Sequence, residues 1–137
     1  AAALDLIFRE GEDAVFARHA AIARAAQAAV TCWSGAGALR LFSQVPQACS
    51  NSITAVAVSP GVDVEAMRTV ARERFQVAFA GGLGPLAGRV FRIGHLGDMN
   101  AAMILGCLAG IEAAMTVQGV PFTPGGVDRA IASLAAG

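Results

Sequence analysis

Near its start, the chain repeats apolar residues at intervals of three and four between about Arg9 and Val30. That spacing places them on one face of an α-helix. His19 lies on the same face, where a half-buried and hydrogen-bonded histidine is expected. The pattern ends at Trp33–Gly37, because serine and glycine there interrupt the helix. The apolar residues on this face are Val15, Phe16, Ile22, Ala23, Ala26 and Val30.

Shorter apolar runs farther along the chain predict β-strands. The run from Ile53 to Val58 is rich in β-branched residues, and turn-forming sequences with Asn, Ser, Pro and Gly flank it on both sides. We therefore expect a buried central strand at Ile53–Val58. Three further short strands are expected at Leu39–Phe42, Gln76–Ala80 and Val90–Ile93.

Local electrostatics mark the next helix. Asp63 can cap its first turn, and Arg72 and Arg74 would lie in its last turn, where their charge suits the helix dipole. This helix is predicted over Val64–Phe75. Two more helices are predicted, one from a cap at Asp98 or Asn100 to about Val117 and one over Val127–Ala135.

The order of these elements predicts an α/β fold class of the α+β type. We expect a single domain over residues 1–137, with a connecting helix at 1–32 and an α/β body at 38–137. Four short strands would form a short, largely antiparallel sheet, with the helices packed on one face. The strands are so apolar that the other face of the sheet is expected to meet a further partner.

Charge and composition narrow the functional classes. Ten arginines balance ten acidic residues, and the chain has no lysine at all. With zero formal net charge and no aromatics interleaved with the arginines, the chain has no basic face for nucleic acid. The three cysteines, odd in number and set among small or apolar residues, indicate reduced thiols and an intracellular, cytoplasmic location.

The stretch from Ala101 to Gly119 is nearly uncharged and approaches the length of a membrane span. Its apolarity comes mostly from alanine and glycine, and Glu112 lies inside it. We therefore favour a core helix over a membrane span. Gly106 and Gly110, four residues apart, would let another backbone approach this helix, either from its own domain or from a second subunit.

Few residues offer chemistry. The glycine-rich segment Gly81–Gly88 has no following Lys-Ser or Lys-Thr, and a strand rather than a helix comes next, which argues against a nucleotide loop. His19 and His95 lack partners at metal-ligand spacing, so no metal site is predicted. His95 follows a strand, where either a site role or a structural hydrogen bond is open. No catalytic nucleophile and base can be paired from spacing.

Arg92 is the candidate binding residue. Strand alternation would direct Phe91 and Ile93 to one face and Arg92 to the other, beside the glycine-rich bend. A guanidinium on a rigid strand can bind a carboxylate through two parallel hydrogen bonds. From the residues alone, a structural ion pair is slightly favoured over a ligand contact.

The glycine-rich run Gly81–Gly88, followed by Phe91–Gly97, resembles the C-terminal part of class V aminotransferases of the alanine-glyoxylate, serine-glyoxylate and serine-pyruvate group. The flanking segments agree. Leu4–Gly11 with Val15–His19 resembles the helix that leaves the large domain of that family, and Ser50–Val56 resembles the first long strand of its small domain.

This resemblance implies fold type I, a pyridoxal-phosphate cofactor and a homodimer whose active site uses both subunits. It also implies that Arg92 binds the α-carboxylate of the substrate. No catalytic, cofactor-binding or metal-binding residue carries over, because the Schiff-base lysine belongs to the family's large domain. The expected function is the carboxylate-binding portion of an enzyme that transfers an amino group from alanine or serine to glyoxylate or pyruvate, inactive as a fragment. A stand-alone ligand-binding module or a dimerisation domain without catalysis is the alternative.

Overall fold

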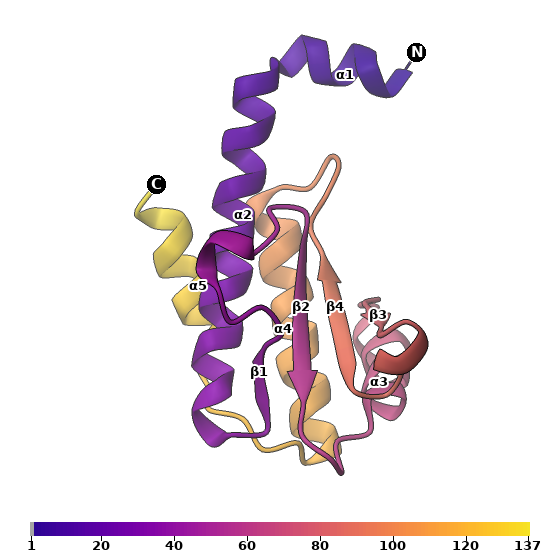
Figure 1. The fold of residues 1–137 in the computed structure, drawn as a ribbon. Coiled ribbons are helices and arrows are strands. Elements are labelled where there is room, and N and C mark those ends of the chain that lie inside the picture. Colours follow the sequence, from indigo (N-terminus) through magenta and orange to yellow (C-terminus); the bar gives the residue numbers. More distant parts are fainter. Residues whose placement is uncertain (1) are drawn as a thin grey trace.

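Four short strands form one sheet in the order β1-β2-β4-β3, and every neighbouring pair is antiparallel (Figure 1). The computed structural model describes residues 2–137. The strands are β1 (Leu39–Leu41), β2 (Ile53–Val58), β3 (Ala80–Gly81) and β4 (Val90–Gly94). The predicted α/β fold class with an antiparallel sheet is confirmed.

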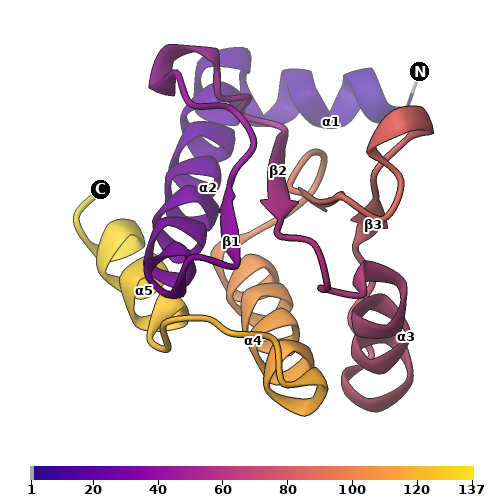
Figure 2. The same cartoon turned by 60° about the horizontal axis from the view of Figure 1, so that its bottom comes forward.

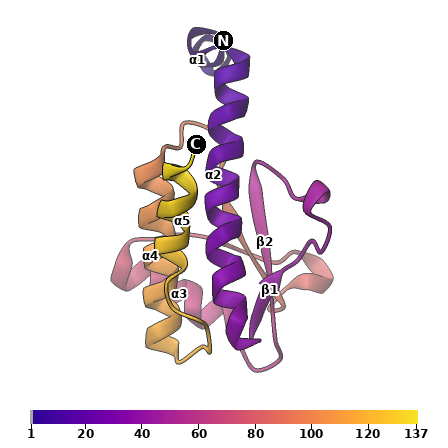
Figure 3. The same cartoon turned by 90° about the vertical axis from the view of Figure 1, so that its left-hand side faces the viewer.

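Five α-helices accompany the sheet within the described residues: α1 (Ala2–Glu10), α2 (Glu12–Trp33), α3 (Val64–Phe75), α4 (Ala101–Gln118) and α5 (Gly126–Ala135). The side view shows α2, α4 and α5 together on one side of β1 and β2 (Figure 3). Helix α3 packs beside α4 (Figure 2). The helices therefore cover one face of the sheet, as predicted, and leave the other face open.

The core lies between the sheet and this helix layer. Val56 on β2 and Phe91 on β4 are register partners and are completely buried. The Phe91 ring meets Phe79 edge to face, with 5.2 Å between ring centroids. Burial of large apolar side chains on this scale is the main contribution that stabilises such a domain. The largest helix residues in the core are Ile22, Trp33, Met67, Ile104, Leu108, Ile111 and Met115.

Within residues 2–137, one helix, Ala101–Gln118, is long and apolar enough to cross a membrane by length and composition. In this fold it is a packed helix that contacts α2, α3 and α5. The Glu112 carboxylate accepts hydrogen bonds from Trp33 Nε1 at 3.0 Å and from the backbone N–H groups of Gly125 and Val127 at 3.1 and 3.3 Å. These contacts join α4 to α2 and to the start of α5, which supports the core-helix interpretation.

The helix caps follow local sequence. The Asp63 side chain accepts a hydrogen bond from the Ala66 N–H at 2.9 Å, and Asn100 does the same for Met103 at 3.0 Å. Of the two candidates for the α4 cap, Asn100 is therefore the residue used. Such caps satisfy backbone donors that have no partner inside the helix.

Three sequence expectations differ from the structure. Phe16, placed on the apolar face of the first helix, is exposed. The first helix is broken at Gly11, whose φ of 92° lies in the left-handed region, and α1 leaves α2 at an angle (Figure 1). Helix α1 has no buried residue and exposes Leu4, Leu6 and Phe8.

The strand expected at Gln76–Ala80 is reduced to Ala80–Gly81. Gln76 takes a left-handed φ of 57° to end α3, and the Val77 N–H bonds back to the Ala71 carbonyl. Because the backbone of Gln76 and Val77 forms this helix cap, it cannot pair with β4 in a longer strand.

Candidate functional site

The open face of the sheet carries Arg92. On β4, Arg92 pairs in register with Ala55 of β2 and Ala80 of β3. Side chains at paired positions share a face, and successive residues alternate between faces. Because Phe91 and Ile93 are buried in the core, Arg92 projects from the opposite side, between two alanines.

The Arg92 side chain is half-buried and has one internal partner. Its Nε donates a hydrogen bond to the Gly81 carbonyl at 2.8 Å. Within residues 2–137, neither of its terminal nitrogens makes a hydrogen bond or an ion pair. The ion pair considered from the sequence is therefore not formed in the described chain. The free edge of the guanidinium is available for a carboxylate, whose two oxygens it can bind in parallel.

The glycine-rich turn brings the Gly81 carbonyl to Arg92. A side chain at Gly82 would place its Cβ 2.1 Å from the Leu86 carbonyl oxygen, so this position has room only for glycine. Gly84 and Gly88 take φ values of 52° and 72°, which suit glycine. The close turn thus fixes Arg92 through its Nε and leaves its outer nitrogens open.

His95 has a structural position. It is completely buried, and its Nε2 lies 2.9 Å from the Thr54 hydroxyl while its Nδ1 lies 3.2 Å from the Asn51 carbonyl. Burial lowers the pKa of His95 below its ordinary value of 6.5. The neutral ring donates from Nδ1 to the carbonyl and accepts the Thr54 hydroxyl proton at Nε2. Of the two roles left open for His95, the structural hydrogen bond is the one observed.

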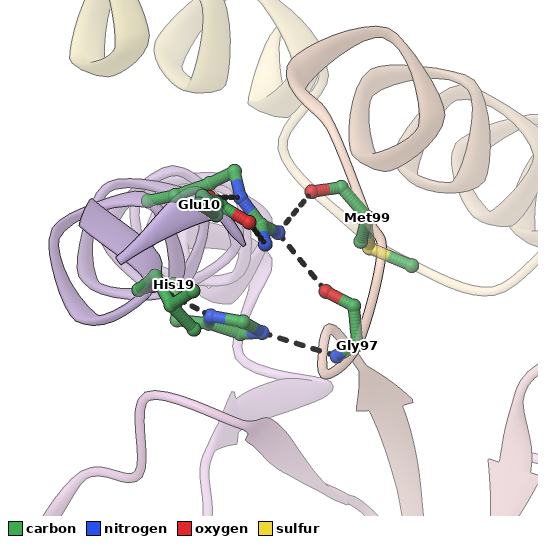
Figure 4. Close-up of polar contacts among 6 residues, drawn as sticks. Glu10, His19, Gly97 and Met99 are labelled. Carbon is green, nitrogen blue, oxygen red and sulfur yellow. Dashed lines mark hydrogen bonds and ion pairs between the residues drawn. The ribbon is translucent and has the colours of Figure 1, made fainter. Parts of the chain in front are cut away.

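Arg18 holds the loop that follows β4 (Figure 4). Its Nε and Nη2 bond the two carboxylate oxygens of Glu10 at 2.7 Å each. Its Nη1 donates to the carbonyls of Gly97 at 2.9 Å and Met99 at 2.8 Å. Hydrogen bonding to Arg18 lowers the pKa of Glu10, and the same contact raises the pKa of Arg18. We refer to this set of contacts as the Arg18 clamp.

His19 completes the attachment of this loop. Its Nε2 accepts the Gly97 N–H at 3.1 Å, and its Nδ1 donates to the Val15 carbonyl at 2.7 Å. The expected hydrogen bonding of His19 is confirmed, and its ring is buried rather than half-buried. The sequence analysis did not identify Arg18, because its partners Gly97 and Met99 lie about eighty positions away and offer only backbone atoms.

The remaining candidates, metal-ligating side chains and cysteines, form no site within residues 2–137. Within residues 2–137, no group of three or more His, Cys, Asp or Glu side chains could hold a metal ion. Cys32, Cys49 and Cys107 are free thiols in the described chain. Burial raises the pKa of the Cys107 thiol, which keeps it protonated and unreactive.

Comparison with known proteins identifies relatives. No protein-family model matches the chain. Serine-glyoxylate aminotransferase of Arabidopsis thaliana is 42% identical over 124 residues, which cover 90% of this chain and 30% of that enzyme. L-aspartate-glyoxylate aminotransferase of Paracoccus denitrificans is 40% identical over 124 residues, again covering 90% and 30%.

A crystal structure of pyridoxamine-pyruvate aminotransferase from Mesorhizobium loti matches the fold with a TM-score of 0.88 and 36% identity. The match covers 97% of this chain and 33% of that one. The chain thus spans about 30% of the length of the curated relatives it matches, in their C-terminal portion.

Proposed function

Because the chain resembles the C-terminal small domain of class V aminotransferases, we propose that it is the substrate-carboxylate-binding portion of a pyridoxal-phosphate-dependent aminotransferase. The observation that carries this proposal is the free guanidinium edge of Arg92 on the open sheet face. The substrates proposed are alanine or serine as amino donor and glyoxylate or pyruvate as acceptor. All four carry a carboxylate that Arg92 can bind.

The residues of this chain do not fit the cofactor. Pyridoxal phosphate is held in such enzymes through an imine to a lysine, and none of the 137 residues is a lysine. No step of the reaction is therefore assigned to this chain beyond substrate binding. The cofactor would be bound by polypeptide outside these residues, in a homodimer whose active site uses residues of both subunits.

Arg92 would bind and orient the substrate. The Gly81 carbonyl restrains its Nε, so the plane of the guanidinium is set before a substrate arrives and less side-chain entropy is lost on binding. A hydrogen bond to a charged group contributes about 1.5 to 3 kcal/mol. Loss of Arg92 should therefore lower kcat/KM by roughly ten- to a hundredfold or more.

The test requires a complete enzyme. In a chimaera, residues 1–137 replace the C-terminal portion of the Arabidopsis relative, and Arg92→Lys and Arg92→Ala are compared with the control Arg129→Lys on α5. Lysine keeps the charge but cannot supply two parallel donors in one plane. We expect both Arg92 variants to lower kcat/KM for an amino acid far more than for its decarboxylated amine analogue, with cofactor absorbance unchanged. Equal losses for both substrates would assign Arg92 to the structure of the domain.

A further inference from the structure

A concave surface lies on the open sheet face, away from Arg92. It encloses about 620 Å³, and Arg92 is not among the residues that line it. Ala57 of β2 and Val90 of β4, which are register partners, form its floor. The side chains of Phe42 and Leu86 contribute apolar walls. A volume of this size is typical of small-ligand sites.

Two arginines line this cavity, Arg40 on β1 and Arg89 in the turn that precedes β4. Arg40 of β1 pairs in register with Ala57, which in turn pairs with Val90, so the three positions form one row across the sheet. Arg89 immediately precedes Val90 and also lines the cavity. Two strand intervals separate the backbones of Arg40 and Val90 by about 10 Å, so the segments that carry the two arginines lie on opposite sides of β2. We call this surface the Arg40–Arg89 groove.

The groove has an unbalanced positive charge. Neither side chain, Arg40 nor Arg89, makes a hydrogen bond or ion pair within residues 2–137, and no aspartate or glutamate lines the groove. The three ion pairs of the described chain lie on α1, α2 and α3. In a chain of zero formal net charge, two unpaired arginines in one concavity concentrate positive potential there and attract an anion.

We propose that the Arg40–Arg89 groove binds a compact oxyanion, a small molecule that carries a phosphate group or two carboxylates. Its charged groups would bind the two guanidinium forks, and its body would rest on Ala57 and Val90. This site is separate from the carboxylate site at Arg92. The proposal does not depend on catalysis by the chain.

The probes are inorganic phosphate and succinate, titrated into the ¹⁵N-labelled chain at constant ionic strength, with sodium chloride as the reference salt. We expect saturable shifts of the Ala57, Gly61 and Gly88 amide signals with phosphate, succinate or both, which also distinguishes the two ligand chemistries. Arg40→Gln and Arg89→Gln should each weaken binding by about tenfold, since each removes charge-assisted hydrogen bonds. Arg129→Gln is the matched control and should bind normally, and thermal melting confirms that each variant is folded.

Three results would overturn the proposal. The first is the absence of saturable binding of both probes. The second is a binding loss in Arg129→Gln as large as in the groove variants. The third is binding by the 137-residue chain that disappears in the chimaera, which would assign the groove to an acidic segment of the longer polypeptide. Because Arg92 does not line the groove and its variants are tested by kinetics in the chimaera, failure here is distinguishable from failure of the carboxylate site.

Discussion

The Arg18 clamp allows a quantitative prediction. Replacing Arg18 with methionine keeps most of the aliphatic stem but removes every donor. Two losses follow: the hydrogen bonds to the carbonyls of Gly97 and Met99, and the ion pair with Glu10. The Arg18 side chain is 26% exposed, so each carbonyl bond is valued at about 1 kcal/mol, the net value of an ordinary intramolecular hydrogen bond and less than that of a buried charged one. We expect the free energy of unfolding to fall by about 2 kcal/mol.

The ion pair should contribute little of this effect. Both partners reach solvent, and exposed pairs are screened and add little to stability. Glu10→Gln is therefore the control, since it removes the charge and leaves the carbonyl bonds of Arg18 in place. We expect a much smaller destabilisation for Glu10→Gln than for Arg18→Met.

Urea unfolding of the two variants, followed by circular dichroism, measures the difference in the free energy of unfolding. In thermal melting, a loss of about 2 kcal/mol corresponds to a Tm decrease of roughly 6 to 10 °C for Arg18→Met. Hydrogen exchange at the Gly97 amide provides a local readout, because that N–H bonds to His19 on the same attachment. The reasoning is refuted if Glu10→Gln destabilises as much as Arg18→Met, or if Arg18→Met leaves both stability and exchange unchanged.

Three further predictions concern the core and the absent lysine. Gly106→Ala should raise the free energy of unfolding by about 0.5 to 1 kcal/mol, since the added Cβ would enter open space. Gly110→Ala should lower it, because the added Cβ would lie 2.4 Å from Val77 Cγ2. Thermal melting of this matched pair checks both predictions. Burial holds the pKa of His95 below 6.5, so the unfolded chain takes up the proton first and stability should fall as pH drops below about 6.5; His95→Gln should flatten that dependence in urea titrations. Incubation of the chain with pyridoxal phosphate and borohydride should yield no adduct at an internal residue and no turnover of alanine with glyoxylate, as judged by mass spectrometry and absorbance.

Local signals made much of the fold predictable. The caps at Asp63 and Asn100 depend on residues within three positions of each other. The Ile53–Val58 strand follows from its own composition and its flanking turns. Alternation on β4 was enough to separate Arg92 from Phe91 and Ile93, because a strand has only two faces. In each of these features the information lies inside one element.

Features that depend on distant segments were not predictable in the same way. The strand expected at Gln76–Ala80 gave way to a left-handed helix end and to a hydrogen bond from Arg68 Nε to the Phe79 carbonyl, which draws that backbone toward α3. The break at Gly11 was not evident from the periodic pattern, because the first apolar residue of that pattern is Val15, after the break. The presence of Arg40 and Arg89 in one groove requires the strand order, which no single stretch of sequence contains.

The packing of α5 along α2 (Figure 3) has a consequence for the order in which the domain forms during synthesis. Helix α2 leaves the ribosome well before α5, and until residues 126–135 emerge, part of its small-residue face lacks its partner. Gly126 then approaches the Trp33 indole so closely that a Cβ there would lie 2.1 Å from Nε1. During that interval the nascent chain presents an uncovered alanine-rich helix, which is a natural substrate for chaperones that bind exposed apolar segments.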